Sequence, residues 1–225
     1  MSRKDRLSKL LGNPHIWRPG SHQVRPGVLP SGFANLDDKL GGGWPLGVLT
    51  EVLQDVQGIG ELRLLMPALA RLGQPAALAP ELRERLGPRR QVCWLMPPYI
   101  PYAPALLQQQ LDITRMLVVD VQRPDDALWA MEQVLRSNVC AAVLGWFTHI
   151  DPRALRRLQL AAEAGSCWVV VFRHSRFLHE RATAPLRLQL QATATGLHIR
   201  ILRNRYGPSG SLTLAINRDV PFLSC

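Results

Sequence analysis

One turn in the sequence has the residue types of a phosphate-binding loop. It contains Gly58 and Gly60, and it is followed directly by Glu61 and Leu62. Glycine lets the backbone fold closely around an anion, and the N–H groups at the start of a helix point towards bound phosphate. A working loop has the pattern G-x-x-x-x-G-K-[ST], in which lysine neutralises phosphate charge and the hydroxyl holds Mg²⁺. The chemistry to test here is therefore nucleotide binding.

The side chains that would perform this chemistry are replaced. Glu61 stands at the lysine position and Leu62 at the hydroxyl position, while Gln54 or Asp55 replaces the first glycine. At about 4 Å and an effective dielectric constant near 20, a carboxylate repels a phosphate charge by about 4 kcal/mol. The helix dipole returns only about 1–2 kcal/mol. We therefore expect no nucleotide, no cofactor and no metal ion here, and Glu61 is also expected to be a surface acid at the helix start.

Two interpretations of this turn stay open on its own residues. It is either a nucleotide site that has lost its chemistry or an ordinary glycine-containing turn between a strand and a helix. The composition of the loop favours the ordinary turn, since two glycines are weak evidence.

The elements around this turn alternate between apolar runs and amphipathic segments. Continuous apolar strands separated by helices are typical of a mostly parallel sheet covered on both faces, and the short loops between the last strands predict an antiparallel extension. In such folds ligands bind at the carboxyl ends of the strands, where this turn would lie. Strands are expected at 48–53, 91–96, 115–121, 139–144, 167–172, 186–191, 197–202 and 211–216, and helices at 61–72, 104–110, 125–136 and 152–164. A short basic helix is expected at 3–11, a loop with one helical turn at 73–90, and Gly165 as the residue that caps the helix at 152–164.

Composition excludes several classes of protein. Of the 225 residues, 47% are hydrophobic and 20% charged, so a packed α/β domain is expected rather than a disordered chain. The four cysteines form no C-x-x-C pair, which argues against a zinc site or a disulfide framework. The first residues lack the apolar core of a signal peptide, and no apolar run approaches a membrane span. A cytoplasmic protein without membrane contact is expected.

The charge is concentrated at the two ends of the chain. The net charge is +10, with six Lys/Arg and one acid in residues 1–30, and eleven Arg and four acids in residues 151–225. We divide the chain into a basic N-terminal helix with a proline-rich linker, residues 1–30, and a core domain, residues 31–225. A basic surface attracts nucleic acid or an acidic protein, although it also serves solubility.

A longer segment, residues 29–52, resembles the entry to the nucleotide-binding core of the RecA family. It contains Leu36-Asp37, the glycines of Gly41-Gly-Gly-Trp-Pro45, and Gly47 before the first core strand. The resemblance implies a RecA-like P-loop NTPase fold, with a mostly parallel central sheet flanked by helices and an antiparallel C-terminal extension.

The same resemblance implies that further catalytic positions are lost. The catalytic glutamate of RecA falls on Pro98, the metal-linked aspartate on Gly145, and the glutamine that senses γ-phosphate on His174. Two lysines that reach a neighbour's nucleotide become Arg203 and Arg205. Loss of the lysine, hydroxyl, glutamate and aspartate together implies a RecA-like core without ATPase activity.

Within this superfamily the chain resembles the ImuA family of proteins associated with translesion DNA synthesis. Long shared stretches include Gly58–Leu62, Pro97–Pro104, Ala127–Ser137 and Arg153–Gln159. The family implies a non-catalytic role in SOS-induced error-prone synthesis, with an ImuB-like protein, an error-prone C-family DNA polymerase and RecA itself as partners. Alternatives are a SulA-type cell-division inhibitor and an active RecA-like ATPase.

Several side chains are candidates for partner or DNA contact. Tyr99 and Tyr102 lie in a proline-rich loop and suit either docking and base stacking or packing on the core. Trp129 and Trp146 lie in apolar stretches and are expected in the core. The arginines suit phosphate contact, a solvated face or an acidic partner; they are Arg153, Arg156, Arg157, Arg200, Arg203 and Arg205.

Overall fold

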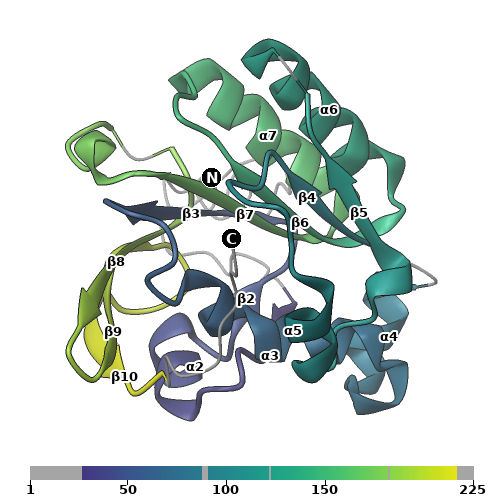
Figure 1. Cartoon of the computed structure of the whole chain (residues 1–225), viewed down its shortest axis with the longest axis horizontal. Helices are drawn as coiled ribbons and strands as arrows, with labels where there is room; N and C mark the ends of the chain where they lie inside the picture. Colours follow the sequence, from purple (N-terminus) through teal and green to yellow (C-terminus); the bar gives the residue numbers. More distant parts are fainter. Residues whose placement is uncertain (1–26, 88–90, 122, 182, 217–225) are drawn as a thin grey trace, which may run out of the picture.

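The computed structural model describes residues 27–87, 91–121, 123–181 and 183–216 (Figure 1). The expected helix at residues 3–11 and most of the linker lie outside this part of the chain. The strands are β1 (Val28–Leu29), β2 (Trp44–Pro45), β3 (Val48–Gln54), β4 (Gln91–Leu95), β5 (Met116–Val119), β6 (Cys140–Trp146), β7 (Trp168–His174), β8 (Leu186–Thr193), β9 (Gly196–Asn204) and β10 (Gly210–Leu214). The helices are α2 (Ala34–Leu40), α3 (Glu61–Gly73), α4 (Pro80–Leu86), α5 (Ala103–Gln108), α6 (Pro124–Ser137) and α7 (Pro152–Gly165), with short 3-10 turns at η1 (Pro75–Ala77), η2 (Ile113–Arg115) and η3 (Ser175–Phe177).

A single eight-stranded sheet organises the domain. Its strand order is β10-β9-β8-β3-β7-β6-β4-β5. The six strands from β8 to β5 run parallel to one another, and β9 and β10 add antiparallel strands at one end. The structure confirms the predicted fold class, an α/β fold with a mainly parallel sheet and an antiparallel C-terminal extension.

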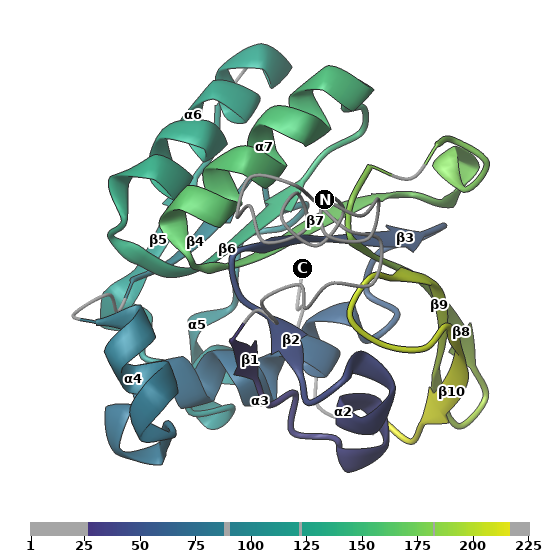
Figure 2. The same cartoon turned by 180° about the vertical axis from the view of Figure 1, so that it is seen from behind.

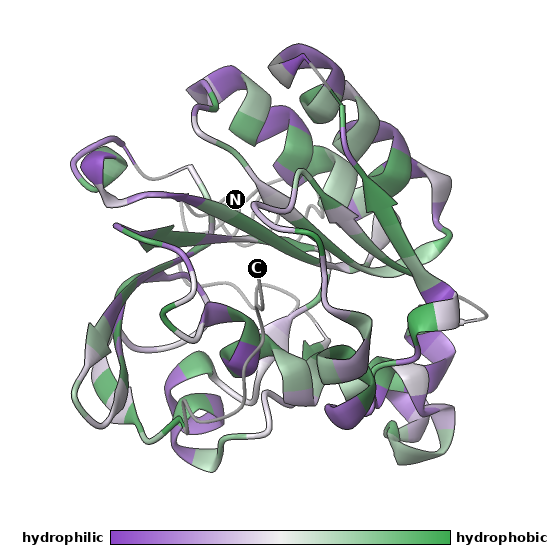
Figure 3. Cartoon of the chain, in the orientation of Figure 1, coloured by the Kyte–Doolittle hydropathy of each residue, from purple (hydrophilic) through white to green (hydrophobic). Residues whose placement is uncertain are grey.

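Helices cover both faces of this sheet. α6 and α7 pack together on one face, and α2, α3, α4 and α5 lie on the other (Figures 1 and 2). Figure 3 shows hydrophobic central strands between helices whose faces are mixed. This agrees with β3, whose seven residues are all buried. Parallel strands that are buried on both faces consist of continuous apolar runs, so their positions can be predicted from the sequence.

Local residues explain where α7 begins and where it ends. The Asp151 carboxylate caps the helix by accepting the backbone N–H groups of Arg153 and Ala154, and these bonds lower the pKa of Asp151. Gly165, expected as the residue that ends the helix, is instead its last helical residue, and Ser166 adopts the left-handed conformation (φ 49°). A Cβ on Gly165 would lie 2.3 Å from the Leu135 carbonyl oxygen, so close packing of α7 on α6 requires glycine.

Two expectations are corrected. Residues 73–90, expected to hold one helical turn, contain η1 and the seven-residue helix α4. Trp129, expected in the core, is 63% exposed on α6, because the buried stripe of that helix runs through Ala127, Met131 and Leu135. Trp146 is buried as expected.

Candidate degenerate nucleotide site

The glycine turn lies where the sequence placed it, at the carboxyl end of a central strand. β3 ends at Gln54 and α3 begins at Glu61. Gly58 (φ 77°) and Gly60 (φ 111°) both take positive φ values that glycine adopts without strain. The backbone N–H groups of the two glycines therefore converge next to the first turn of α3, as in an anion-binding loop.

The Glu61 carboxylate fills this loop. Its Oε1 accepts the N–H of Gly58 at 2.8 Å, and its Oε2 accepts the N–H of Gly60 at 3.1 Å. Glu61 is 4% exposed, so the expectation of a surface acid is wrong. The loop provides two backbone N–H donors and the positive end of a helix, and together these stabilise the carboxylate more than water does. The side chain occupies the donors that a phosphate would need.

Gly145, the residue on which the resemblance places a metal-linked aspartate, has no space for a side chain. A Cβ there would lie 2.5 Å from Cε2 of Phe147 and 3.1 Å from the Met131 sulfur. Gly145 lies inside β6, whose residues are all buried. The neighbouring packing thus fills the place where a metal-binding carboxylate would stand.

Pro98 and His174 belong to the same edge of the sheet as the glycine turn. Pro98 follows β4, and His174 ends β7 opposite Gln54 of β3. Both residues line a cavity of about 350 Å³ together with Gln54 and Trp146. The His174 side chain is exposed, and its Nδ1 accepts the backbone N–H of Arg176. The structure thus gathers the loop, Pro98, Gly145 and His174 at the edge formed by the carboxyl ends of the strands.

The two tyrosine candidates are exposed rather than packed inwards. Tyr99 is 54% exposed and Tyr102 is 43% exposed, with Ile100 between them at 92%. This segment connects β4 to α5, and both tyrosines line a small, mainly apolar groove together with Trp94 and Leu106. The geometry favours contact with another molecule over packing on the domain's own core.

The structure does not gather the candidate arginines into one surface. Arg153, Arg156 and Arg157 lie on α7 on one face of the sheet, whereas the others belong to β9 and the turn after it, near the opposite end (Figures 1 and 2). Arg157 forms an ion pair with Glu132 of α6 at 3.3 Å. Arg200, Arg203 and Arg205 are exposed.

Comparison with curated proteins finds a similar sequence. The chain is similar to SulA. It is 25% identical over 130 residues to the cell division inhibitor SulA of Serratia marcescens, which is 58% of this chain and 70% of that protein. No protein-family model matches the chain. At this identity the match supports a SulA-like relationship and no finer one.

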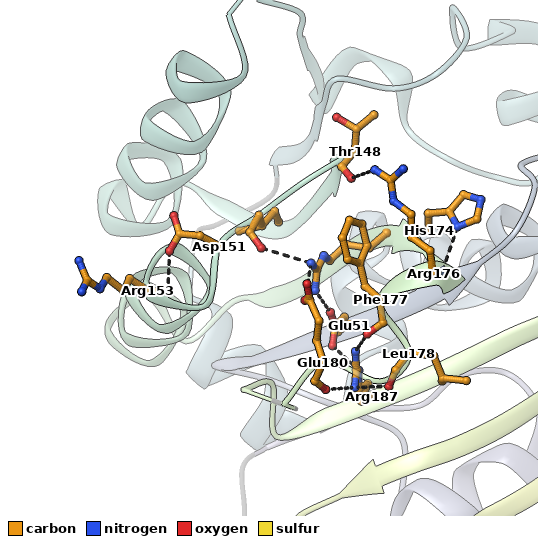
Figure 4. A network of polar contacts seen from close by, with 12 residues as sticks. Glu51, Thr148, Asp151, Arg153, His174, Arg176, Phe177, Leu178, Glu180 and Arg187 are labelled. Carbon is orange, nitrogen blue, oxygen red and sulfur yellow. Dashed lines mark hydrogen bonds and ion pairs between the residues drawn. The ribbon is translucent and has the colours of Figure 1, made fainter.

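The residues that sequence analysis missed form a buried ionic network (Figure 4). Glu51 of β3 pairs with Arg173 of β7 at 2.6 Å and with Arg187 of β8 at 2.7 Å. All three side chains are at most 4% exposed. Arg173 also binds Glu180 at 2.9 Å and the Ile150 carbonyl at 3.2 Å. Ion pairs thus link the three parallel strands β3, β7 and β8 inside the domain, where most neighbouring side chains are apolar.

This network also holds the segment between β7 and β8. Arg187 donates to the carbonyl oxygens of Phe177, Leu178 and Glu180, and Arg173 lies 4.3 Å from the centre of the Phe177 ring. A buried arginine that satisfies three carbonyls acts as a structural anchor for the loop. The sequence does contain a clue: Glu51, Arg173 and Arg187 each interrupt an apolar strand.

Within the described ranges, no group of three His, Cys, Asp or Glu side chains has the arrangement to hold a metal ion. Cys93, Cys140 and Cys167 are buried free thiols. The hydrogen bond with Cys140, together with burial, raises the pKa of Cys93, which keeps that thiol neutral and unreactive. In the same part of the chain, no helix is long and apolar enough to cross a membrane.

Proposed function

We propose that this protein is a non-catalytic accessory subunit of SOS-induced error-prone translesion DNA synthesis. It would act by binding an ImuB-like protein and an error-prone C-family DNA polymerase, with RecA as a further partner. The observation on which the proposal depends is the Glu61 carboxylate, which binds the N–H groups of Gly58 and Gly60. A loop filled by its own side chain supports a protein that works through its surface.

An active ATPase is the alternative that this geometry disfavours most. Nucleotide would have to displace Glu61 and then lack a lysine, a Mg²⁺-binding hydroxyl at Leu62 and a carboxylate at Gly145. Because tight ligand binding raises Tm, ATP with Mg²⁺ should leave the melting temperature unchanged. A clear rise in Tm, or heat of ATP binding by calorimetry, would refute the non-catalytic assignment.

The surface best suited to a protein partner lies at the β5 end of the sheet. Exposed apolar side chains lie on several elements there, on both faces of the sheet: Tyr99, Ile100 and Tyr102 after β4, Leu107 on α5, Leu117 and Val118 on β5, and Trp129 on α6. Exposed apolar groups of this number are characteristic of binding surfaces, and Tyr and Trp are the side chains most enriched in their energetic centres.

Co-purification tests the proposal directly. The tagged protein is isolated from DNA-damaged cells, and the associated proteins are identified. We expect an ImuB-like protein and a C-family polymerase, and we expect the double variant Ile100→Ser, Trp129→Ser to lose most of both. Leu160→Ser is the matched control, since Leu160 is 53% exposed on α7, away from the β5 end. Recovery of neither protein with the unaltered chain would end the proposal.

The basic ends of the chain are a second set of candidate contacts. Deletion of residues 1–30 tests them as a tether, and Arg200→Ser with Arg203→Ser tests the exposed arginines of β9. Weaker partner recovery with either change supports these assignments, and full recovery with both removes them. DNA contact through the same arginines would show as binding that falls steeply with salt concentration.

The similarity to SulA supports a second candidate function, a stoichiometric inhibitor of cell division. Overexpression in undamaged growing cells distinguishes the two. Filamentation without DNA damage favours the inhibitor. Normal division together with recovery of the polymerase complex favours the accessory subunit.

A further inference from the structure

The sheet ends in an apolar strand that is open on its outer side. β5 is the last strand of the sheet, and β4 is its partner strand in the described part of the chain (Figure 1). All four residues of β5 are apolar, and Figure 3 shows the strand as hydrophobic. Leu117 is 44% exposed and Val118 is 48% exposed. Because successive side chains of a strand point to opposite faces, apolar surface is exposed on both faces of this edge.

The backbone of β5 has hydrogen-bonding groups that face away from the sheet. The Met96 N–H donates to the Val119 carbonyl at 2.8 Å, so the backbone groups of Val119 face β4. These groups alternate in direction along a strand, so those of Leu117 also face β4, and those of Met116 and Val118 face outwards. Within the described ranges, the N–H and C=O of Val118 have no backbone partner on that side.

The other edge of the sheet, β10, is protected in a way that β5 is not. The exposed side chains of β10 are Ser211 and Thr213, whereas Leu212 packs against the core and Leu214 is buried. Proteins protect edge strands with charged side chains, proline, bulges or short length. β5 is short, but it contains no charge and no proline, and its pairing with β4 has no bulge. β5 therefore has the features of an edge that accepts another strand.

The charges around β5 favour a cationic strand. The segment that follows β5 carries three acids and one arginine, all exposed: Asp120, Arg123, Asp125 and Asp126. At the other end of β5, Arg115 is already paired with Asp112 at 3.1 Å. The carboxyl end of the edge is thus acidic although the whole chain has a net charge of +10. Exposed charges add little affinity, but they select the orientation and the identity of a partner.

A second copy of this chain fits the edge less well. Antiparallel pairing of two β5 strands about Val118 places Met116 of each copy opposite Asp120 of the other. The Met116 N–H already donates to the Ile113 carbonyl, so one hydrogen bond is missing at each end of the pair. The net charge of +10 on both copies adds repulsion.

We propose that β5 binds an extended segment of a protein partner as an additional strand of the sheet. The segment has apolar side chains that cover Leu117 and Val118, and a lysine or arginine beside Asp120. In strand addition, main-chain hydrogen bonds supply affinity and alternate side chains supply specificity. This inference deepens the partner surface at the β5 end and rests on the proposed function for the identity of the partner.

Hydrogen exchange of the full-length protein tests the edge without a natural partner. The probe is a short synthetic peptide of alternating valine and threonine with a lysine at each end. One control peptide has every valine and threonine N-methylated, and another has glutamate in place of lysine. We expect the probe to slow exchange of the Val118 amide at least tenfold, the N-methylated peptide to leave it unchanged, and the glutamate peptide to bind severalfold more weakly.

Three results of this experiment would overturn the proposal. They are no binding of the probe, binding without protection of the Val118 amide, and equal protection by the N-methylated peptide. Equal binding of the glutamate peptide would remove the cationic partner. A dimer of the free chain that Val118→Pro dissociates would assign the edge to a second copy instead.

Two proline variants separate the outer edge from the inner ladder. Val118→Pro removes an outward N–H, so we expect nearly unchanged Tm and at least tenfold weaker binding of the probe peptide. Leu117→Pro removes an N–H that faces β4 and should lower Tm. Val118→Thr keeps the backbone and should bind within severalfold of the unaltered chain. Equal losses of Tm in the two proline variants, or unchanged peptide affinity in Val118→Pro, would contradict the proposal.

Co-purification from DNA-damaged cells then connects the edge to the proposed function. We expect Val118→Pro to lose most of the proteins that the unaltered chain recovers, and Val118→Thr to keep them. Equal recovery with Val118→Pro would overturn strand addition and leave the proposed function standing. Recovery of neither expected protein with the unaltered chain would refute the proposed function, and the peptide experiment would still decide whether the edge accepts a strand.

Discussion

At the scale of single residues, the chain's own atoms fill the glycine turn and the space around Gly145. Glu61 does more than reverse the charge of a lysine, since its carboxylate takes the two backbone donors of the loop. Gly145 likewise does more than lack a carboxylate, since Phe147 and Met131 fill the volume around it. Placing a lysine at position 61 or a carboxylate at position 145 would therefore not by itself create a nucleotide site.

Removing the Glu61 carboxylate should expose the loop. In Glu61→Ala the N–H groups of Gly58 and Gly60 lose their acceptor, which should cost about 1–3 kcal/mol of unfolding free energy. Because the donors are then free for an external anion, sulfate or phosphate should raise the Tm of this variant more than that of the unaltered protein. Thermal melts in a titration of phosphate measure both effects. An equal response of the two proteins would show that the loop binds no anion.

Introducing an acidic side chain at position 145 should destabilise the fold. Gly145→Asp forces a side chain against the Phe147 ring, and overpacking of this kind costs about 1–3 kcal/mol before the penalty for a buried charge is added. Gly145→Ala is the control that separates the two terms, because it adds the steric conflict alone. Urea unfolding of both variants gives the values. A Gly145→Asp protein as stable as the unaltered chain would contradict the packing argument.

At the scale of elements, the central strands are held together by more than apolar contact. Glu51 links β3 to β7 and β8. Arg187 anchors residues 177–180 through their carbonyl groups, and Arg173 binds the Glu180 carboxylate and lies against the Phe177 ring. Buried ion pairs of this kind are weak evidence of net stability, but removing one partner leaves an uncompensated charge. Removing a single partner should therefore cost much more stability than the intact ion pairs contribute, and this difference can be measured.

Glu51→Gln should be among the most damaging substitutions in the sheet. It leaves Arg173 and Arg187 buried without their shared carboxylate, a loss of about 3–5 kcal/mol. Glu132→Gln is a matched control, since Glu132 also bridges two arginines, Arg136 and Arg157, whose side chains are each 60% exposed. That change should cost less than about 1 kcal/mol. Chemical denaturation of the two variants makes the comparison, and similar losses would contradict it.

At the scale of the whole molecule, the antiparallel extension is part of the core rather than an appended arm. Leu197, Ile199, Ile201 and Leu214 are buried in the same cluster as residues of α3 and β6. The exposed arginines of β9 project from this structural layer. A surface function of those arginines can therefore be tested only by point changes.

A chain that ends before β9 should fail to fold. Truncation after residue 195 removes two strands and uncovers β8, and we expect loss of cooperative thermal unfolding by circular dichroism. The full-length Arg200→Ser, Arg203→Ser variant should keep the unaltered melting profile, because both side chains are exposed. Cooperative melting of the truncated chain would show that the extension is separable.

The sequence by itself determined the order and type of the elements, the mainly parallel sheet and the position of the glycine turn. Continuous apolar runs, glycines and helix-starting residues act locally, so they can be recognised without the fold. The tertiary structure decided what that turn holds. Burial of Glu61, the closed volume at Gly145, the exposure of Trp129 and the open edge of β5 depend on neighbours contributed by other strands and helices. Charge balance at Glu51 depends in the same way on two strands more than a hundred residues further along the chain.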